Sequence, residues 1–164
     1  MTQVQPNIQL LQSKKIIGIR MSMSLADNKT ALLWKTFMPR RKEIMNNVNE
    51  ELFSINIYPA GYNPANLADE FEKWAAVEVS NDSIIPENMQ SFTLQEGLYA
   101  VFHYKGSGND TSIFQYIFTE WLPSSGYVLD NRPHFEVLGK LYKNASPDSE
   151  EDIWIPIKPK SNLQ

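Results

Sequence analysis

The segment LFSINIY, residues 52–58, shows the clearest pattern of apolar and polar positions in the chain. Phe53, Ile55 and Ile57 alternate with polar residues, so they would share one face of a half-buried strand. Other runs rich in β-branched and aromatic residues predict further strands. The predicted strands span residues 15–23, 52–58, 71–80, 97–105, 134–142 and 153–158.

Two segments instead show helical spacing of apolar residues. The first begins near Asn28 or Thr30, either of which can cap it, and continues to Ile44. Pro39 falls inside this run, so we expect a kink or a restart there. The second predicted helix covers residues 112–122, and Pro123 begins the stretch that ends it.

These elements occur in the order strand–helix–strand–strand twice, with a nearly constant offset along the chain, which indicates an internal duplication. We therefore expect an α+β fold of two modules related by a pseudo-two-fold axis. Its sheets would be antiparallel, its helices would lie on one face, and a ligand cleft would lie between the modules. Residues 1–164 form one domain in this interpretation. Module one covers residues 12–80, a connector 81–95, and module two 96–158.

Charge and composition narrow the function classes. The net charge is −4, and the one dense basic run, Arg40-Arg41-Lys42, reads as a solvated helix end, so we expect no direct binding of nucleic acid. The chain has no cysteine, which excludes disulfides, thiol catalysis and Cys-based zinc sites. Neither a signal peptide nor a long apolar run is visible. We expect a cytoplasmic protein without a cofactor, metal or membrane partner.

The second half of the chain carries several short motifs in one order. Gly97 opens a strand, WLPSSGY stands at residues 121–127, RP and FE follow within 132–136, and IPI stands at 155–157. This order resembles the GyrI-like effector-binding domain, the small-molecule-binding module of some AraC-type and MerR-type regulators, which also occurs alone. The resemblance is specific over residues 96–158. Over 12–80 it is looser, resting on KTFMPRRKEI and FEKWAAVEV.

The resemblance implies the same duplicated fold and a pocket for bulky aromatic, often cationic, ligands. Family regulators place an acidic residue in this pocket on the strand after the RP motif, which here is Glu136. They carry a DNA-binding domain before this module. Only about 14 residues precede the module here, so operator binding is not implied.

Glu136 is the first candidate ligand-binding residue, because a carboxylate among aromatic rings attracts cations. By period two, Phe135 and Val137 take one face of the strand and Glu136 the other. From the residues alone, the favoured interpretation is a glutamate that faces water or pairs with Arg132 or Lys140; the resemblance shifts it to a ligand role. Glu120, at the border of the second helix's apolar side, is a second candidate. Glu78 is a third carboxylate, and it shares a strand face with Trp74.

Aromatic residues supply the remaining candidates. Tyr58, Trp74, Tyr104 and Trp154 each lie on a predicted strand whose other face is more aliphatic, so we expect them to reach the pocket. The two histidines, His103 and His134, are interpreted as structural. They lie far apart in the sequence and match no metal-binding or catalytic motif.

The leading hypothesis is a stand-alone effector-binding protein that binds an amphipathic aromatic or cationic molecule between its modules. One alternative is a hydrolase of a reactive small molecule, with Glu120 or Glu136 as general base. Another is a protein-interaction module that inhibits a DNA enzyme. The sequence does not choose a ligand, a protein partner or an oligomeric state.

Overall fold

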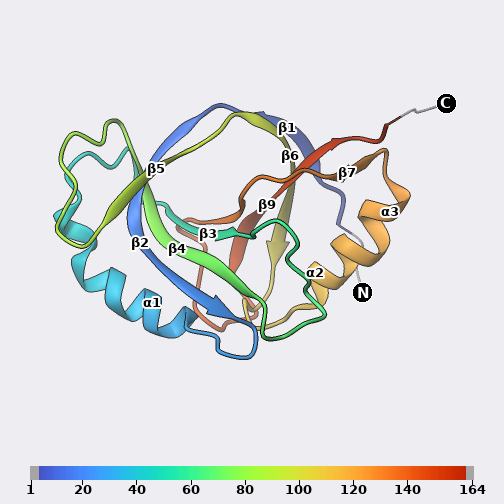
Figure 1. Cartoon of the computed structure of the whole chain (residues 1–164), viewed down its shortest axis with the longest axis horizontal. Coiled ribbons are helices and arrows are strands. Elements are labelled where there is room, and N and C mark those ends of the chain that lie inside the picture. The colour runs from blue at the N-terminus through green and yellow to red at the C-terminus, as the bar shows by residue number, and fades with distance from the viewer. Residues whose placement is uncertain (1–3, 162–164) are drawn as a thin grey trace.

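The computed structural model describes residues 4–161, which build one nine-stranded sheet and two helical segments (Figure 1). All neighbouring strands are antiparallel. The fold is therefore α+β, as predicted. The strands are β1 (Asn7–Leu11), β2 (Lys14–Ser24), β3 (Leu52–Ile57), β4 (Glu70–Val79), β5 (Gln90–Leu94), β6 (Gly97–Lys105), β7 (Tyr127–Leu129), β8 (His134–Leu138) and β9 (Glu150–Pro159).

The helical segments lie where the apolar spacing predicted them. Helix α1 (Thr30–Phe37) passes into the 3-10 helix η1 (Met38–Glu43). Pro39 lies at the start of η1, so the expected break at this proline is confirmed. The second segment runs through α2 (Ser112–Tyr116), a π-helical stretch η2 (Ile117–Trp121) and α3 (Leu122–Ser124). None of the helices in residues 4–161 has the length and apolar content to cross a membrane.

The strand order shows how the two halves of the chain join. It reads β1-β6-β9-β8-β3-β4-β2-β5, with β7 added beside β9. The β3–β8 pair forms the seam between the modules, and Ser54 lies opposite Glu136 there. If β1 is matched with β5, β2 with β6, β3 with β8 and β4 with β9, the order is the same from either end. This matches a duplication, and the pseudo-two-fold axis itself stays a prediction.

Two strands lie outside the predicted module boundaries. Strand β5 falls within residues 81–95, which were expected to be a connector, and it pairs with β2. Strand β1 precedes module one in the sequence but pairs with β6 of module two. Both strands are short and lie at the ends of the sheet order. Their side chains are mostly exposed or half-buried, so they lack the strong apolar pattern of the central strands.

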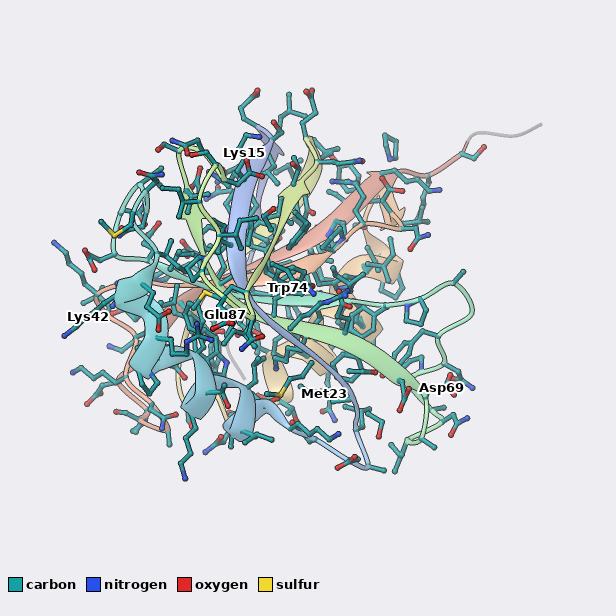
Figure 2. The ribbon with its side chains drawn as sticks, turned by 60° about the vertical axis from the view of Figure 1, so that its left-hand side comes forward. Lys15, Met23, Lys42, Asp69, Trp74 and Glu87 are labelled. Carbon is teal, nitrogen blue, oxygen red and sulfur yellow. The ribbon has the colours of Figure 1, made fainter. Side chains whose placement is uncertain are left out.

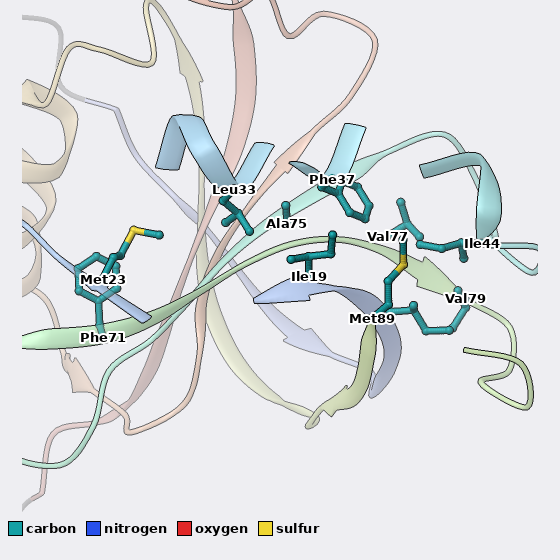
Figure 3. Close-up of a cluster of buried hydrophobic side chains, with 11 residues drawn as sticks. Ile19, Met23, Leu33, Phe37, Ile44, Phe71, Ala75, Val77, Val79 and Met89 are labelled. Atoms are coloured by element: carbon teal, nitrogen blue, oxygen red, sulfur yellow. The ribbon is translucent and has the colours of Figure 1, made fainter. Parts of the chain in front are cut away.

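The core is divided between the two faces of the sheet. On the helix face, one apolar cluster packs beneath α1, where Figure 3 shows Leu33 and Phe37 near Ile19 and Ala75. A second cluster packs beneath α2 and η2 and includes Ile153. On the opposite face, a third cluster is rich in aromatic rings, and its members include Phe53, Ile55, Trp74, Tyr99 and Phe135.

Candidate functional site

Glu136 lies on the helix face, between the two apolar clusters. Its neighbour Ser54 pairs in turn with Ala75 of the first cluster, and Glu136 itself pairs with Ile153 of the second. Phe135, by contrast, is only 2% exposed within the opposite-face core. The predicted alternation of Phe135 and Glu136 is therefore confirmed. Glu136 is half-buried in the seam between the modules.

A second carboxyl group, that of Glu151 on β9, lies beside Glu136. Glu151 is 6% exposed, and its side chain is hydrogen-bonded to that of Glu136. Burial is the main cause that raises the pKa of Glu151, and the adjoining Glu136 raises it further. The Glu151 carboxyl group consequently stays protonated at neutral pH, and its O–H group donates a hydrogen bond to the Glu136 carboxylate. These two hydrogen-bonded carboxyl groups form the polar floor of this seam.

Glu151 is not among the predicted site residues because the last predicted strand begins only at residue 153. The signal was present in the period of β9, since Glu151 shares a face with Ile153, Ile155 and Ile157. A carboxyl group in line with three buried isoleucines must itself lie toward the core.

Lys73 on β4 brings a positive charge to the same face. Its ammonium group donates a hydrogen bond to Thr30 Oγ1 of α1, with a nitrogen–oxygen distance of 3.2 Å. Burial lowers the pKa of Lys73, while the charges of Glu136 and Glu151 act in the opposite direction. Lys73 forms no direct ion pair with the residues that the structure describes. It acts on the carboxyl pair through space.

Aromatic rings from both modules surround this floor. The Tyr58 ring lies 4.7 Å from that of Tyr62 and 5.0 Å from that of His134, measured between centroids. The His134 ring in turn lies 6.2 Å from that of Phe118 on η2. His134 thus links the aromatic residues of the two modules.

Burial sets the protonation states of these rings. It raises the pKa of Tyr58 to about 12 and lowers that of His134 to about 4. Both side chains are therefore neutral at physiological pH. The Tyr58 hydroxyl accepts a hydrogen bond from the Asn56 amide at 3.0 Å, but Asn56 Oδ1 is buried without a partner among the described residues. The seam therefore combines a carboxyl pair, neutral rings and one unused buried acceptor.

The other predicted binding residues lie in three different places. Tyr104 is on the helix face, where it pairs with Glu151 across the sheet, and its hydroxyl donates to the Ser107 carbonyl at 3.0 Å. Glu120 is exposed on η2. Trp74 and Trp154 belong to the cluster on the opposite face, and Figure 2 places Trp74 near the middle of the molecule. The structure therefore groups Tyr58 and Tyr104 with Glu136, and separates the two tryptophans from it.

The opposite face also contains a cavity of about 360 Å³. Trp154 and Glu78 line it, together with Phe53 and Phe135. The Trp154 and Phe135 rings are stacked, with centroids 5.2 Å apart. Glu78 is paired with Lys14, with a nitrogen–oxygen distance of 3.2 Å. Glu78 thus lies on the same face as Trp74 and Trp154, and not on the face of Glu136.

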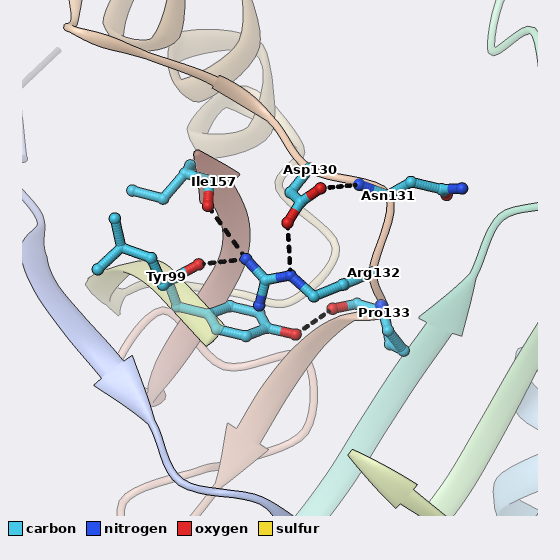
Figure 4. Close-up of polar contacts among 7 residues, drawn as sticks. Tyr99, Asp130, Asn131, Arg132, Pro133 and Ile157 are labelled. Atoms are coloured by element: carbon cyan, nitrogen blue, oxygen red, sulfur yellow. Dashed lines mark hydrogen bonds and ion pairs between the residues drawn. The ribbon is translucent and has the colours of Figure 1, made fainter. Parts of the chain in front are cut away.

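The RP motif positions β8. The Arg132 side chain donates to Asp130 Oδ2 at 2.8 Å and to the Leu98 and Ile157 carbonyls at 2.6 and 3.0 Å (Figure 4). It also lies 4.7 Å from the centre of the Tyr99 ring. A Cβ atom at Gly97 would collide with the guanidinium group. Gly97 and the RP motif thus fix the loop that precedes β8.

Comparison with known proteins identifies the family. Residues 7–157 match the Cass2 family, described as integron-associated effector-binding proteins. The chain belongs to this family. The GyrI-like effector-binding resemblance of the sequence motifs is thereby confirmed.

The transcriptional regulator BrlR of Pseudomonas aeruginosa is a relative with 28% identity over 144 residues, covering 87% of this chain. The chain spans about half (51%) of the length of BrlR.

Solved structures share the fold. SAV2435 bound to tetraphenylphosphonium has a TM-score of 0.72 at 18% identity, covering 96% of this chain and 94% of that one. The integron cassette protein VCH_CASS2 of Vibrio cholerae has a TM-score of 0.66 at 15% identity, with coverages of 94% and 97%. These likenesses agree with the α+β architecture of this effector-binding protein.

Proposed function

We propose that this effector-binding protein binds a bulky aromatic cation in the seam between its modules, with Glu136 as the charged contact. The observation that carries this proposal is the carboxyl pair of Glu136 and Glu151, which lies among neutral aromatic rings. A lone cation such as a metal ion or a simple amine would not use these rings. An aromatic cation would use both the charge and the rings.

The chemistry of the seam supports a cation rather than an anion. Lys73 is held by Thr30 and forms no ion pair, so the carboxylate of the pair lacks a directly bonded positive partner within residues 4–161. A buried charge without a partner is unfavourable, and a ligand cation would remove that penalty. The fold relative SAV2435 was solved with a lipophilic cation of this class, tetraphenylphosphonium.

The aromatic rings would act as the entrance to the site. Tyr58 and Tyr62 pack on one another at the border of the cluster beneath α1, and both are only half-buried. Displacing these two rings would expose the carboxyl pair to a bulky aromatic ligand. The rings would then stack on the ligand instead of on each other.

Isothermal titration calorimetry with tetraphenylphosphonium tests the proposal. We expect saturable binding to the wild-type protein, and an affinity at least about tenfold weaker for Glu136→Gln, because a charge-assisted contact is lost. Glu96→Gln is the matched control, since Glu96 is an exposed loop residue, and its affinity should equal that of the wild type. Triphenylphosphine oxide, which has similar rings and no net charge, should bind more weakly.

Equal affinities of the wild-type and Glu136→Gln proteins would remove Glu136 from the site. A wild-type protein that binds no lipophilic cation would contradict the proposed function as a whole. Recovery of the ligand unchanged after incubation separates binding from turnover.

The biological role would follow from capture of such a cation. We propose that this chain acts on its ligand by sequestration, or passes the bound state to a separate partner protein. Pull-down with and without tetraphenylphosphonium distinguishes these two roles.

A further inference from the structure

The carboxyl pair holds a proton on Glu151, in addition to the charge on Glu136 that would attract a cation. Glu136 on β8 and Glu151 on β9 project from neighbouring strands onto the same face, since Glu136 pairs with Ile153, and the Glu151 side chain is hydrogen-bonded to that of Glu136. Two ionised carboxylates in contact repel one another strongly in a dry environment. Glu151 therefore keeps its proton, because losing it would place a second negative charge beside Glu136.

Among the residues that the structure describes, the groups around the pair are not expected to change charge when a ligand binds, whereas Glu151 can lose its proton. Lys73 of β4 is the cation that acts on both glutamates, and it is tethered to Thr30. Asp152, next to Glu151 on β9, adds a negative charge that further favours the protonated form. The other ionisable residues that face the pair are neutral at physiological pH, namely Tyr58, Tyr104, Tyr142 and His134.

We propose that Glu151 is a second ligand-binding carboxyl group, which ionises when a cation enters and releases its proton to solvent. The inference rests on the proposed function of the seam. The O–H bond of Glu151 breaks, its electron pair stays on the carboxylate, and the proton passes to water or buffer. The bound cation then lies between two carboxylates, so one positive charge has replaced another.

This exchange makes the site selective for charge. A permanent cation gains attraction from both carboxylates once the proton has left. A neutral molecule of the same shape cannot replace the proton, so it meets the closed, hydrogen-bonded pair. Glu151 therefore sets specificity between cationic and neutral ligands, in addition to the contact made by Glu136.

Proton release is measured by titrating the protein with tetraphenylphosphonium, which has no ionisable proton of its own. Calorimetry at pH 7 in phosphate and in Tris, two buffers with different ionisation enthalpies, gives the number of protons released. We expect close to one proton per ligand bound. By linkage, the affinity should rise about tenfold per pH unit between pH 6 and pH 8.

Two variants separate Glu151 from other titrating groups. In Glu151→Gln the released proton and the pH dependence should both disappear, because the amide cannot ionise. Glu96→Gln should keep both, since Glu96 is exposed and distant in sequence from the pair. Circular dichroism checks that each variant is folded.

The outcomes distinguish this inference from the proposed function. Absence of tetraphenylphosphonium binding contradicts the proposed function. Binding with no proton release and a flat pH profile leaves that function standing and overturns the exchange. The wild-type proton count decides the matter even if Glu151→Gln does not fold.

Discussion

The two faces of the sheet at β8 carry different kinds of side chain. On the opposite face, Phe135 stacks between Phe53 and Trp154, at centroid distances of 5.7 and 5.2 Å. On the helix face, one residue further along, Glu136 meets Glu151. The rings of the aromatic stack pack against one another. On the helix face, Glu151 keeps a proton, and Asn56 Oδ1 is buried without a hydrogen-bond partner among the described residues. One face of the seam is closed by aromatic packing, whereas the other presents, between two apolar clusters, the carboxyl pair that we propose as the ligand contact.

The largest expected effect breaks the stack on the opposite face. Phe135→Ala removes a ring that is 2% exposed, so the free energy of unfolding should fall by about 3–5 kcal/mol. Urea denaturation followed by tryptophan fluorescence measures it. Glu136→Gln, the adjacent residue on the other face, should change stability far less. Similar losses from the two variants would contradict the division between the faces.

The next effect concerns acid stability and belongs to the helix face. Burial lowers the pKa of His134 to about 4 from its ordinary 6.5, so the unfolded chain binds a proton that the folded chain rejects. Stability contributed by neutral His134 is therefore lost as the pH falls from about 6.5 towards 4. The full loss is roughly 3 kcal/mol.

Chemical denaturation at several pH values between 7 and 4 checks this loss in the wild type and in His134→Gln. The variant should show a shallower fall in stability over that range. An identical slope in the two proteins would mean that His134 is not the group responsible.

A smaller effect tests the loop that carries β8. Arg132→Gln removes the ion pair with Asp130 and at least one carbonyl contact, so we expect a loss of about 1–3 kcal/mol in the free energy of unfolding. Arg41→Gln, which removes a partly exposed arginine paired with the exposed Glu50, is the control and should cost at most about 1 kcal/mol. If the two variants lost equal stability, Arg132 would be no more than a surface ion pair.

The smallest effect sharpens the contrast between the faces. Trp154→Phe keeps a ring in the opposite-face stack, and the indole nitrogen that it removes has no partner among the described residues. We therefore expect the affinity for tetraphenylphosphonium, measured by calorimetry, to change by less than about twofold. A large loss of affinity would mean that the ligand enters from the side of the tryptophan cavity.

Much of the fold followed from local patterns. The central strands and both helices were predicted because their apolar residues repeat at the spacing of the element that they form. The three-residue strand β7 was not predicted. Strands β1 and β5 were not predicted either, since each is short and has little buried surface of its own. Their structure depends on pairing with β6 and β2, and such pairing is not visible in a local stretch of sequence.

The candidate site was predicted less completely for a related reason. Period two indicates which residues share a strand face, and it correctly separated Phe135 from Glu136. It does not indicate which face of β4 or β9 matches which face of β8, so Trp74 and Trp154 were grouped with Glu136 although they lie behind it. Glu151 and Lys73 enter the site only through the register of neighbouring strands.

The pairing of β1 with β6 has a consequence for synthesis of the chain. Asn7 lies opposite Val101 in this pair, so β1 emerges from the ribosome about 90 residues before its partner. At ordinary rates of translation this delay is roughly 5–20 s. During that interval β1 has no strand to pair with, and module one must wait for its neighbour before the sheet is complete. Protection of the nascent chain against proteolysis should therefore appear late, after β6 has left the ribosome.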